Sequence, residues 1–88
     1  MDYNKEATFL KVLGHPIRLR IVELLLSSDI CVKNIWSCLN LPQAKVSQHL
    51  GILKDRGVLN AHRKGSLVLY SVADKRVKGI LKALKEEN

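Results

Sequence analysis

Apolar residues repeat at helical spacing along most of this chain, and the pattern changes to that of β-strands only once. Helical patterns cover the segments 5–13, 16–26, 32–39, 43–55 and 74–87. Between residues 58 and 72 the chain reads as two short extended runs around a turn at Lys64 to Ser66, which predicts a β-hairpin. Four helices, a hairpin and a last helix leave few folds open, and all of them are mainly α-helical.

Glycine and proline mark where several of these segments begin or end. Gly14 follows the first helix in the position of a C-terminal cap, and Gly57 does the same after the fourth. Pro16 suits the first turn of the second helix, because the N–H that proline lacks has no partner there. With 88 residues the chain has the length of one domain, so we predict a single domain over residues 1–88.

The helices predicted at 32–39 and 43–55 are separated by a three-residue turn that begins at Asn40. A short turn between two helices is typical of a helix-turn-helix, whose second helix enters the major groove of DNA. The hairpin that follows is basic at its tip, residues 62–66, and fits a wing. We therefore predict a winged helix-turn-helix fold with the order α-α-α-α-β-β-α.

The predicted recognition helix, 43–55, has an apolar face and a polar face. Val46, Leu50 and Leu53 share one side of this helix and are expected to point into the core. Glutamine can pair bidentately with adenine and serine can donate or accept, so both suit contacts with base edges. The predicted DNA contacts are the small and polar residues of the first turns, namely Gln43, Ala44, Lys45, Ser47 and Gln48. The same residues would also suit the solvated face of an ordinary helix.

Further candidate contacts lie at the wing tip and beside the apolar face of the recognition helix. Arg63 and Lys64 are placed to contact phosphates or a minor groove, although a solvated loop would have the same composition. His49 is placed either to contact a phosphate or to be half-buried in a structural role. His15 precedes Pro16 at a helix start, where capping or packing is a better interpretation than metal binding.

The net charge of the chain fits a nucleic-acid partner. Against 8 acidic residues there are 15 lysines and arginines, which gives a formal net charge of +7 and a pI of about 9.7. A basic domain carries the electrostatic footprint of nucleic-acid binding, although membrane surfaces and acidic proteins would attract it as well. The sequence shows no signal peptide and no span long enough to cross a bilayer, so we expect a cytoplasmic protein that binds double-stranded DNA and no membrane.

An enzymatic function is poorly supported, because the sequence shows no nucleophile–base pattern, phosphate-binding loop or metal motif. The alternative to a regulator is another kind of binding module: a winged helix that contacts a protein, or one that binds DNA without any effector. Trp36 and the terminal helices offer surfaces for a protein partner, although a tryptophan at that position is more often part of the core. A steep loss of affinity with salt would distinguish phosphate contacts from a protein interaction.

Three stretches of the chain resemble the ArsR/SmtB family of winged-helix repressors. Residues 10–21, which read LKVLGHPIRLRI, resemble the opening motif of that family. Residues 41–50, LPQAKVSQHL, resemble its recognition helix, and the stretches DRGVL, RKG and L-Y-S further on resemble its wing. The motifs occur in the order of the family, and the resemblance covers about residues 7–85.

This resemblance implies both a function and an assembly. It implies a repressor that binds an imperfect inverted repeat in a promoter and is released by an effector. It also implies a homodimer built on the first and last helices, here near residues 5–13 and 74–87. The apolar faces of these two helices agree with such a dimer, but they would equally serve a core within one chain.

The residues with which many members of the family bind metal ions are not kept in this chain. One site uses a Cys-Val-Cys pattern, and the matching stretch keeps Cys31 but has Lys33 at the second thiolate position. A lysine ammonium is a poor ligand and repels a cation. The other site uses an Asp-x-His pattern with later His and Glu ligands, whereas Asp74 is followed by Lys75 and Arg76 and no histidine comes after them. We therefore predict no metal site and no cofactor.

The two cysteines, Cys31 and Cys38, leave two interpretations open. They are too few for a disulfide scaffold and fit a reducing compartment. Within one helix their Cα atoms would lie about 10 Å apart, too far for an intrachain disulfide, so we interpret them as inert packing residues. The alternative is a thiol that senses an effector, either as a single reactive group or by bonding to a second chain. The neighbouring Lys33 would lower the pKa of the Cys31 thiol and so favour its reaction.

Overall fold

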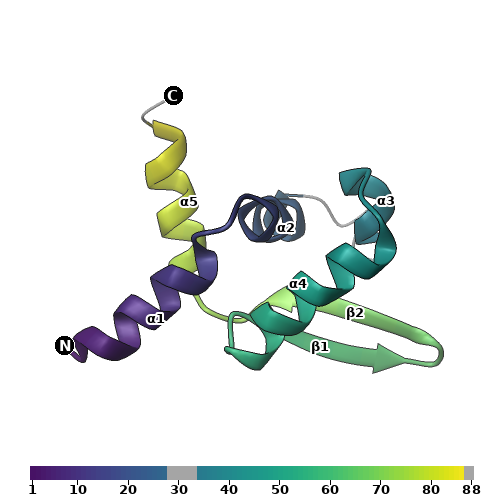
Figure 1. The fold of residues 1–88 in the computed structure, drawn as a ribbon, viewed down its shortest axis with the longest axis horizontal. Helices are drawn as coiled ribbons and strands as arrows, with labels where there is room; N and C mark the ends of the chain where they lie inside the picture. Colours follow the sequence, from purple (N-terminus) through teal and green to yellow (C-terminus); the bar gives the residue numbers. More distant parts are fainter. Residues whose placement is uncertain (28–33, 87–88) are drawn as a thin grey trace.

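The computed structural model describes residues 1–27 and 34–86. Within these residues the chain forms α1 (Tyr3–Leu13), α2 (Pro16–Ser27), α3 (Ile35–Leu39), α4 (Gln43–Asp55), β1 (Leu59–Lys64), β2 (Leu67–Val72) and α5 (Arg76–Glu86). This order confirms the predicted winged-helix arrangement of four helices, a hairpin and a last helix (Figure 1). None of the described helices is both long enough and apolar enough to cross a bilayer.

The helix α2 lies at the centre of the fold, where it contacts β2 and each of the other helices (Figure 1). Ile21 and Val22 of α2 are fully buried, as expected for a helix that has apolar residues on two sides. Each large apolar side chain buried in this way contributes about 1.5–3 kcal/mol. The rest of the buried apolar core consists of Val12, Leu13, Ile35, Leu39, Val46, Leu50, Leu53, Val58, Leu59, Val77 and Leu81.

Local caps explain where α1 begins and where α4 ends. The Asp2 side chain accepts the backbone N–H of Lys5 at 3.1 Å, so α1 starts at Tyr3 rather than at residue 5 as predicted. Gly57 follows α4 with a φ of 78°, and the N–H groups of Gly57 and Val58 donate to carbonyl oxygens near the helix end. The predicted capping role of Gly57 is therefore confirmed.

The helix α3 is shorter than the helix predicted over 32–39. It begins at Ile35, because Asn34 before it is not helical, and it ends at Leu39. Asn40 then adopts the left-handed conformation, with a φ of 56°, and redirects the chain toward the start of α4. The short turn of the helix-turn-helix is therefore confirmed, and the start of its first helix is corrected.

The strands β1 and β2 form an antiparallel hairpin that pairs Leu59 with Val72 at its base and Lys64 with Leu67 at its tip. We predicted that the first extended run ends at residue 62, but the pairing continues to Lys64. Only two residues remain for the turn, and Gly65 takes the positive φ of 64° that such a turn requires. The hairpin runs along α4 and projects toward the end of the molecule that holds α3 (Figure 1).

The terminal helices α1 and α5 meet at the other end of the molecule, away from α3 and the hairpin turn (Figure 1). Arg76 of α5 forms an ion pair with Glu6 of α1, and its guanidinium lies 4.1 Å from the centre of the Phe9 ring. We predicted a helix from Asp74, but α5 begins at Arg76. The Asp74 carboxylate instead accepts the backbone N–H of Arg76 at 2.9 Å and caps the helix.

Candidate nucleic-acid interface

The outward side of α4 carries most of the residues that were predicted to contact DNA. Val46, Leu50 and Leu53 are buried, which confirms the predicted inward face of this helix. The short turn that begins at Asn40 places the start of this helix beside α3 (Figure 1). The side chains exposed in its first turns are those of Gln43, Ala44, Lys45, Ser47 and Gln48.

The amino-terminal end of α4 is the end that favours an anionic partner. Pro42 precedes the helix, and its first turn contains no acidic residue. The amide groups at a helix start carry a partial positive charge, which the exposed Lys45 reinforces. Asp55 is exposed at the opposite end, so a phosphate backbone would meet a favourable potential at the start of α4 and a less favourable one at its end.

His49 differs from the other predicted contacts, because its side chain is only 8% exposed. Its ring lies 4.4 Å from the ring of His15, measured between centroids, and its Nδ1 lies 3.4 Å from Nη1 of Arg18. Of the two interpretations of His49, the structure favours the structural one over a phosphate contact. The Nδ1 atom of His15 accepts the N–H of Ile17 at 3.1 Å, so the predicted capping role of His15 is confirmed.

The wing presents its basic residues on both faces of the hairpin. His62, Arg63 and Lys64 are all exposed near the end of β1. Successive residues of a strand point to opposite faces, so Arg63 lies on one face while His62 and Lys64 share the other. If the hairpin lies with one face on the DNA, only one of Arg63 and Lys64 can contact it. Both can contact DNA only if the hairpin tip enters a groove.

Of the two interpretations of Trp36, the structure rejects the core position and agrees with the exposed one. The side chain of Trp36 is 41% exposed, because α3 uses Ile35 and Leu39, four residues apart, to face the core. Trp36 instead borders a small pocket that Gln43, Ser47 and other residues of α4 and β2 also line. Sequence reasoning did not place Trp36 beside the DNA-contact candidates. The signal for it is the position of Trp36 directly after the inward-facing Ile35 on a short helix, which turns the tryptophan away from the core.

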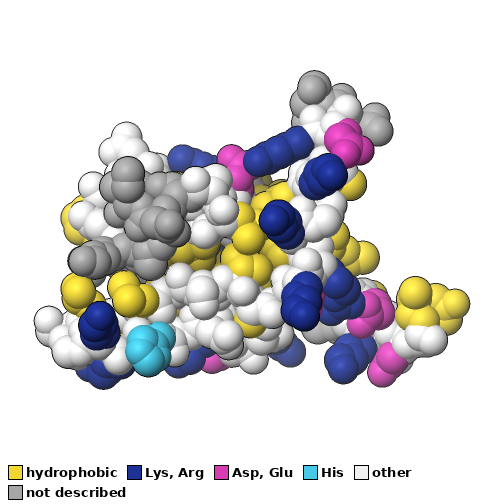
Figure 2. All heavy atoms as spheres, turned by 180° about the vertical axis from the view of Figure 1, so that it is seen from behind, with side chains coloured by type: hydrophobic (Ala, Val, Ile, Leu, Met, Phe, Trp, Pro, Cys, Tyr) yellow, Lys and Arg dark blue, Asp and Glu magenta, His cyan; other side chains and the backbone are white. Residues whose placement is uncertain are grey.

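Part of the positive charge lies on α5 rather than on α4. Figure 2 shows basic side chains along α5, beside apolar side chains that lie between α2 and α5. Lys78, Lys82 and Lys85 line this depression together with Leu26 and Leu81. The ammonium group of Lys85 is 3.5 Å from the carboxylate of Glu23 on α2. The net charge of the chain therefore does not by itself locate a DNA-binding surface.

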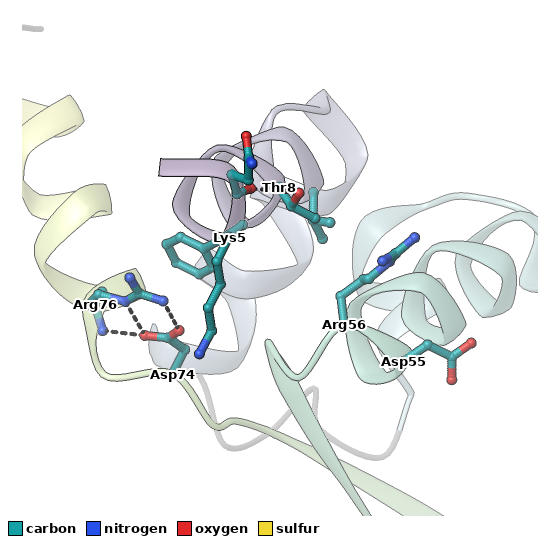
Figure 3. A pocket seen from close by; sticks show the side chains of 9 residues that line it. Lys5, Thr8, Asp55, Arg56, Asp74 and Arg76 are labelled. Atoms are coloured by element: carbon teal, nitrogen blue, oxygen red, sulfur yellow. Dashed lines mark hydrogen bonds and ion pairs between the residues drawn. The ribbon is translucent and has the colours of Figure 1, made fainter. Parts of the chain in front are cut away.

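Asp74, the first residue of the second metal motif in the family resemblance, is bound by an arginine of the same chain. Its carboxylate accepts from Nε of Arg76 at 3.0 Å and from Nη2 at 2.8 Å, beside a pocket between α1, α4 and α5 (Figure 3). The hydrogen bonds from Arg76 hold the pKa of Asp74 below its usual value. Across residues 1–27 and 34–86, no three side chains of the metal-binding types gather in one place.

The two cysteines are only partly described. Cys38 is exposed on α3, and its sulfur is in a disulfide rather than a free thiol. Cys31 and Lys33 lie outside the described residues. The interpretation of Cys38 as an inert packing residue is therefore wrong. The argument against a disulfide assumed that both cysteines lie in one helix, whereas α3 begins at Ile35 and does not contain Cys31.

Comparison with known families gives a match that includes the site. Residues 15–61 match the model of the family described as bacterial regulatory protein, arsR family. The matched segment contains α2, α3 and α4 and reaches into β1. It therefore includes the whole helix-turn-helix and the central helix on which it packs.

Similar proteins extend the match to nearly the full chain. An uncharacterized HTH-type transcriptional regulator of Methanocaldococcus jannaschii is 40% identical over 96% of this chain and 96% of its own length. The transcriptional repressor PagR of Bacillus anthracis is 40% identical over 96% of this chain and 85% of its own length, and its crystal structure superposes with a TM-score of 0.80. HlyU from Vibrio cholerae is 31% identical and superposes with a TM-score of 0.83 over 98% of this chain and 96% of its own.

Proposed function

Because the chain belongs to the ArsR family of bacterial regulatory proteins, we propose that it represses transcription as a homodimer bound to an inverted-repeat operator. Its general class follows from the family: it is a DNA-binding transcriptional regulator with a helix-turn-helix, and not an enzyme. In the proposed complex the start of α4 lies in the major groove, and the β1–β2 wing contacts the backbone or the minor groove.

The exposed amino-terminal half of α4 is the observation that supports this mode of binding. Gln48 and Ser47 are exposed there without an acidic neighbour in the first turn. The side chains of Ala44 and Ser47 are small, which allows the helix backbone to approach base edges closely. Glutamine and serine can then read the edges by hydrogen bonds, while Lys45 contacts the phosphates.

The exposed apolar side chains of the terminal helices support the homodimer. Tyr3 and Leu10 of α1 are 78% and 55% exposed, and seven residues apart they lie on the same side of the helix. Leu84 of α5 is 49% exposed. Exposed large apolar side chains on α1 and α5 are candidates for a surface that a partner covers. We propose that a second copy of the chain covers α1 and α5 and leaves α4 and the wing free (Figure 1).

A symmetric dimer of this kind fixes the spacing of its two half-sites. The two recognition helices would contact major grooves about one helical turn of DNA apart, or a multiple of it, so the operator has the same two-fold symmetry as the protein. We also propose that the protein acts in the cytoplasm, because a transcriptional regulator has to reach chromosomal DNA.

The first experiment is a footprint of the purified protein on the DNA upstream of its own gene, at two salt concentrations. We expect one protected region with two-fold symmetry, and an affinity that falls steeply as salt rises. Binding no tighter than to random DNA would reject an operator in that region. Binding that is insensitive to salt and sequence would favour the protein-interaction alternative.

The wing makes its own prediction about the dependence of affinity on salt. If the hairpin tip enters a groove, so that both faces of the wing meet DNA, Arg63→Ala and Lys64→Ala should each weaken binding. The loss should be about the same on operator and on random DNA, because phosphate contacts carry no sequence information. Each lost contact should lower the slope of log affinity against log salt by about 1 per protomer. Fluorescence anisotropy over a series of salt concentrations measures this slope. A variant with an unchanged slope has no phosphate contact at that position.

A further inference from the structure

Two histidines at the junction of α2 and α4 use the same ring atom as a hydrogen-bond acceptor. Nδ1 of His15 accepts the backbone N–H of Ile17, and Nδ1 of His49 lies 3.4 Å from Nη1 of Arg18. A guanidinium has only donors, so His49 has to accept in this contact. A ring nitrogen accepts only while it carries no proton, so the contact requires a neutral His49 with its proton on the other nitrogen.

Arg18 connects this pair to the end of α1. Its Nε donates to the carbonyl oxygen of Val12 at 2.6 Å, while its Nη1 faces His49 in the middle of α4. The His15 ring packs against the His49 ring at an interplanar angle of 43°. The placement of α4 relative to α1 and α2 therefore depends on a polar contact as well as on the apolar core.

The surroundings of His49 oppose a positive charge on its ring. The titratable and charged groups that act on it are His15, Arg18 and Lys45, and none of them is acidic. Burial, followed by these three groups, lowers the pKa of His49 below its usual value of 6.5. A proton on Nδ1 would turn the acceptor into an N–H aimed at a guanidinium, and the contact would be lost.

We infer that Arg18 is a positioning residue for DNA binding, which fixes the recognition helix through a contact that exists only while His49 is neutral. This inference rests on the proposed function, since it assumes that α4 reads DNA. It adds a dependence on pH that the proposed function does not contain. Binding to the operator therefore weakens as His49 becomes protonated, although the added positive charge alone would strengthen attraction to DNA.

The same linkage has a defined sign for stability. The pKa of His49 is lower in the folded chain than in the unfolded chain. As the pH falls, His49 therefore takes up its proton in the unfolded chain at a higher pH than in the folded chain. The contribution of His49 to stability is complete above the pKa of the unfolded chain. It is lost as the pH falls from about 6.5 toward the folded pKa.

The first test uses the free protein, so its result does not depend on DNA. NMR spectra recorded from about pH 8 to 5 follow the His49 ring and the backbone amides of Gln48 and Leu50. We expect His49 to titrate below the usual histidine range, with the two α4 amides changing at the same midpoint. If the amide signals of α4 do not change as His49 titrates, the positioning role is overturned.

The second test compares affinity for the operator with affinity for random DNA of the same length, at constant ionic strength. All proteins carry His62→Gln, so that the wing imidazole adds no charge as the pH falls. One pH unit below the pKa of His49, about a tenth of the protomers keep the contact between Arg18 and His49. We therefore expect the ratio of operator affinity to random-DNA affinity to fall about tenfold per protomer. His49→Gln has no such proton to gain, and its ratio should change less than about twofold. Equal losses in both proteins would overturn the inference.

Variants of two arginines on α2 separate positioning from general stability. Arg18→Gln should lower the affinity ratio at neutral pH and flatten its pH profile, and Arg18→Lys should restore part of the ratio because it keeps a donor. Arg20→Gln is the matched control, since Arg20 donates to the carbonyl oxygen of Leu39 at 3.0 Å and is not among the charged groups that act on His49. The control should keep the pH profile. An unchanged pH profile in Arg18→Gln would overturn the inference. A parent protein that binds operator and random DNA equally well would instead reject the proposed function, and the NMR titration would then decide whether the contact between Arg18 and His49 depends on pH.

Discussion

Leu53→Ala is expected to lower the free energy of unfolding by about 2–5 kcal/mol. Leu53 is fully buried on the inner side of α4. The substitution loses the transfer free energy of the side chain and leaves a cavity that its neighbours only partly fill. Small domains are stable by about 5–15 kcal/mol, so the loss is a large share of the total. Because Leu53 anchors α4 to the core, the recognition helix should also lose its fixed position.

Denaturant unfolding at one fixed protein concentration measures this effect, because association of two chains would make stability depend on concentration. Lys54→Ala is the matched control, since Lys54 is the exposed next residue of the same helix. The control should change stability by less than about 0.5 kcal/mol. A loss in Leu53→Ala no larger than in Lys54→Ala would contradict the described packing of α4.

Leu10→Arg is expected to convert the proposed homodimer into monomers and to lower operator affinity by about a hundredfold or more. Leu10 is an exposed apolar residue of α1, on the same side as Tyr3. A guanidinium buried against apolar side chains of a second copy would lack a partner, which costs several kcal/mol. A monomer contacts one half-site at a time and therefore loses the gain in affinity from two linked sites, about 100-fold to 10,000-fold.

Light scattering after size-exclusion chromatography gives the oligomeric state, and an operator titration gives the affinity. Thr8→Arg is the control, because it adds the same charge to the same helix at an exposed position on the other side. We expect the control to remain a dimer. A dimeric Leu10→Arg protein would remove α1 from the proposed interface, and a monomeric parent protein would reject the homodimer altogether.

The sequence predicted best what short-range chemistry determines. The range of α4 and its inner face were predicted correctly, because apolar residues recur there at one period between a proline and a glycine. The hairpin was predicted from two extended runs around the turn at Lys64 to Ser66, and its strand β1 extends further because the turn is shorter than predicted. Such features depend on residues within a few positions of one another.

The sequence predicted least where distant side chains meet. The contact between Arg18 and His49 joins residues 31 positions apart, and the Arg76–Glu6 ion pair joins residues 70 positions apart. No periodicity shows such pairs. For Trp36 the sequence left a core position and an exposed one open, and the structure decides for the exposed one because α3 turns Ile35 and Leu39 toward the core. The sequence was therefore enough to predict the interface helix, whereas the side chains that surround it could be placed only from the structure.

The central claim is that the exposed start of α4 reads base edges, and one comparison tests it most directly. The affinities of the parent protein and of Gln48→Ala are measured on the footprinted operator and on random DNA at one salt concentration. We predict that Gln48→Ala loses about 1–3 kcal/mol on the operator and almost nothing on random DNA, because the glutamine amide reads a base and not a phosphate. An equal loss on both DNAs, or no loss on either, would contradict the account.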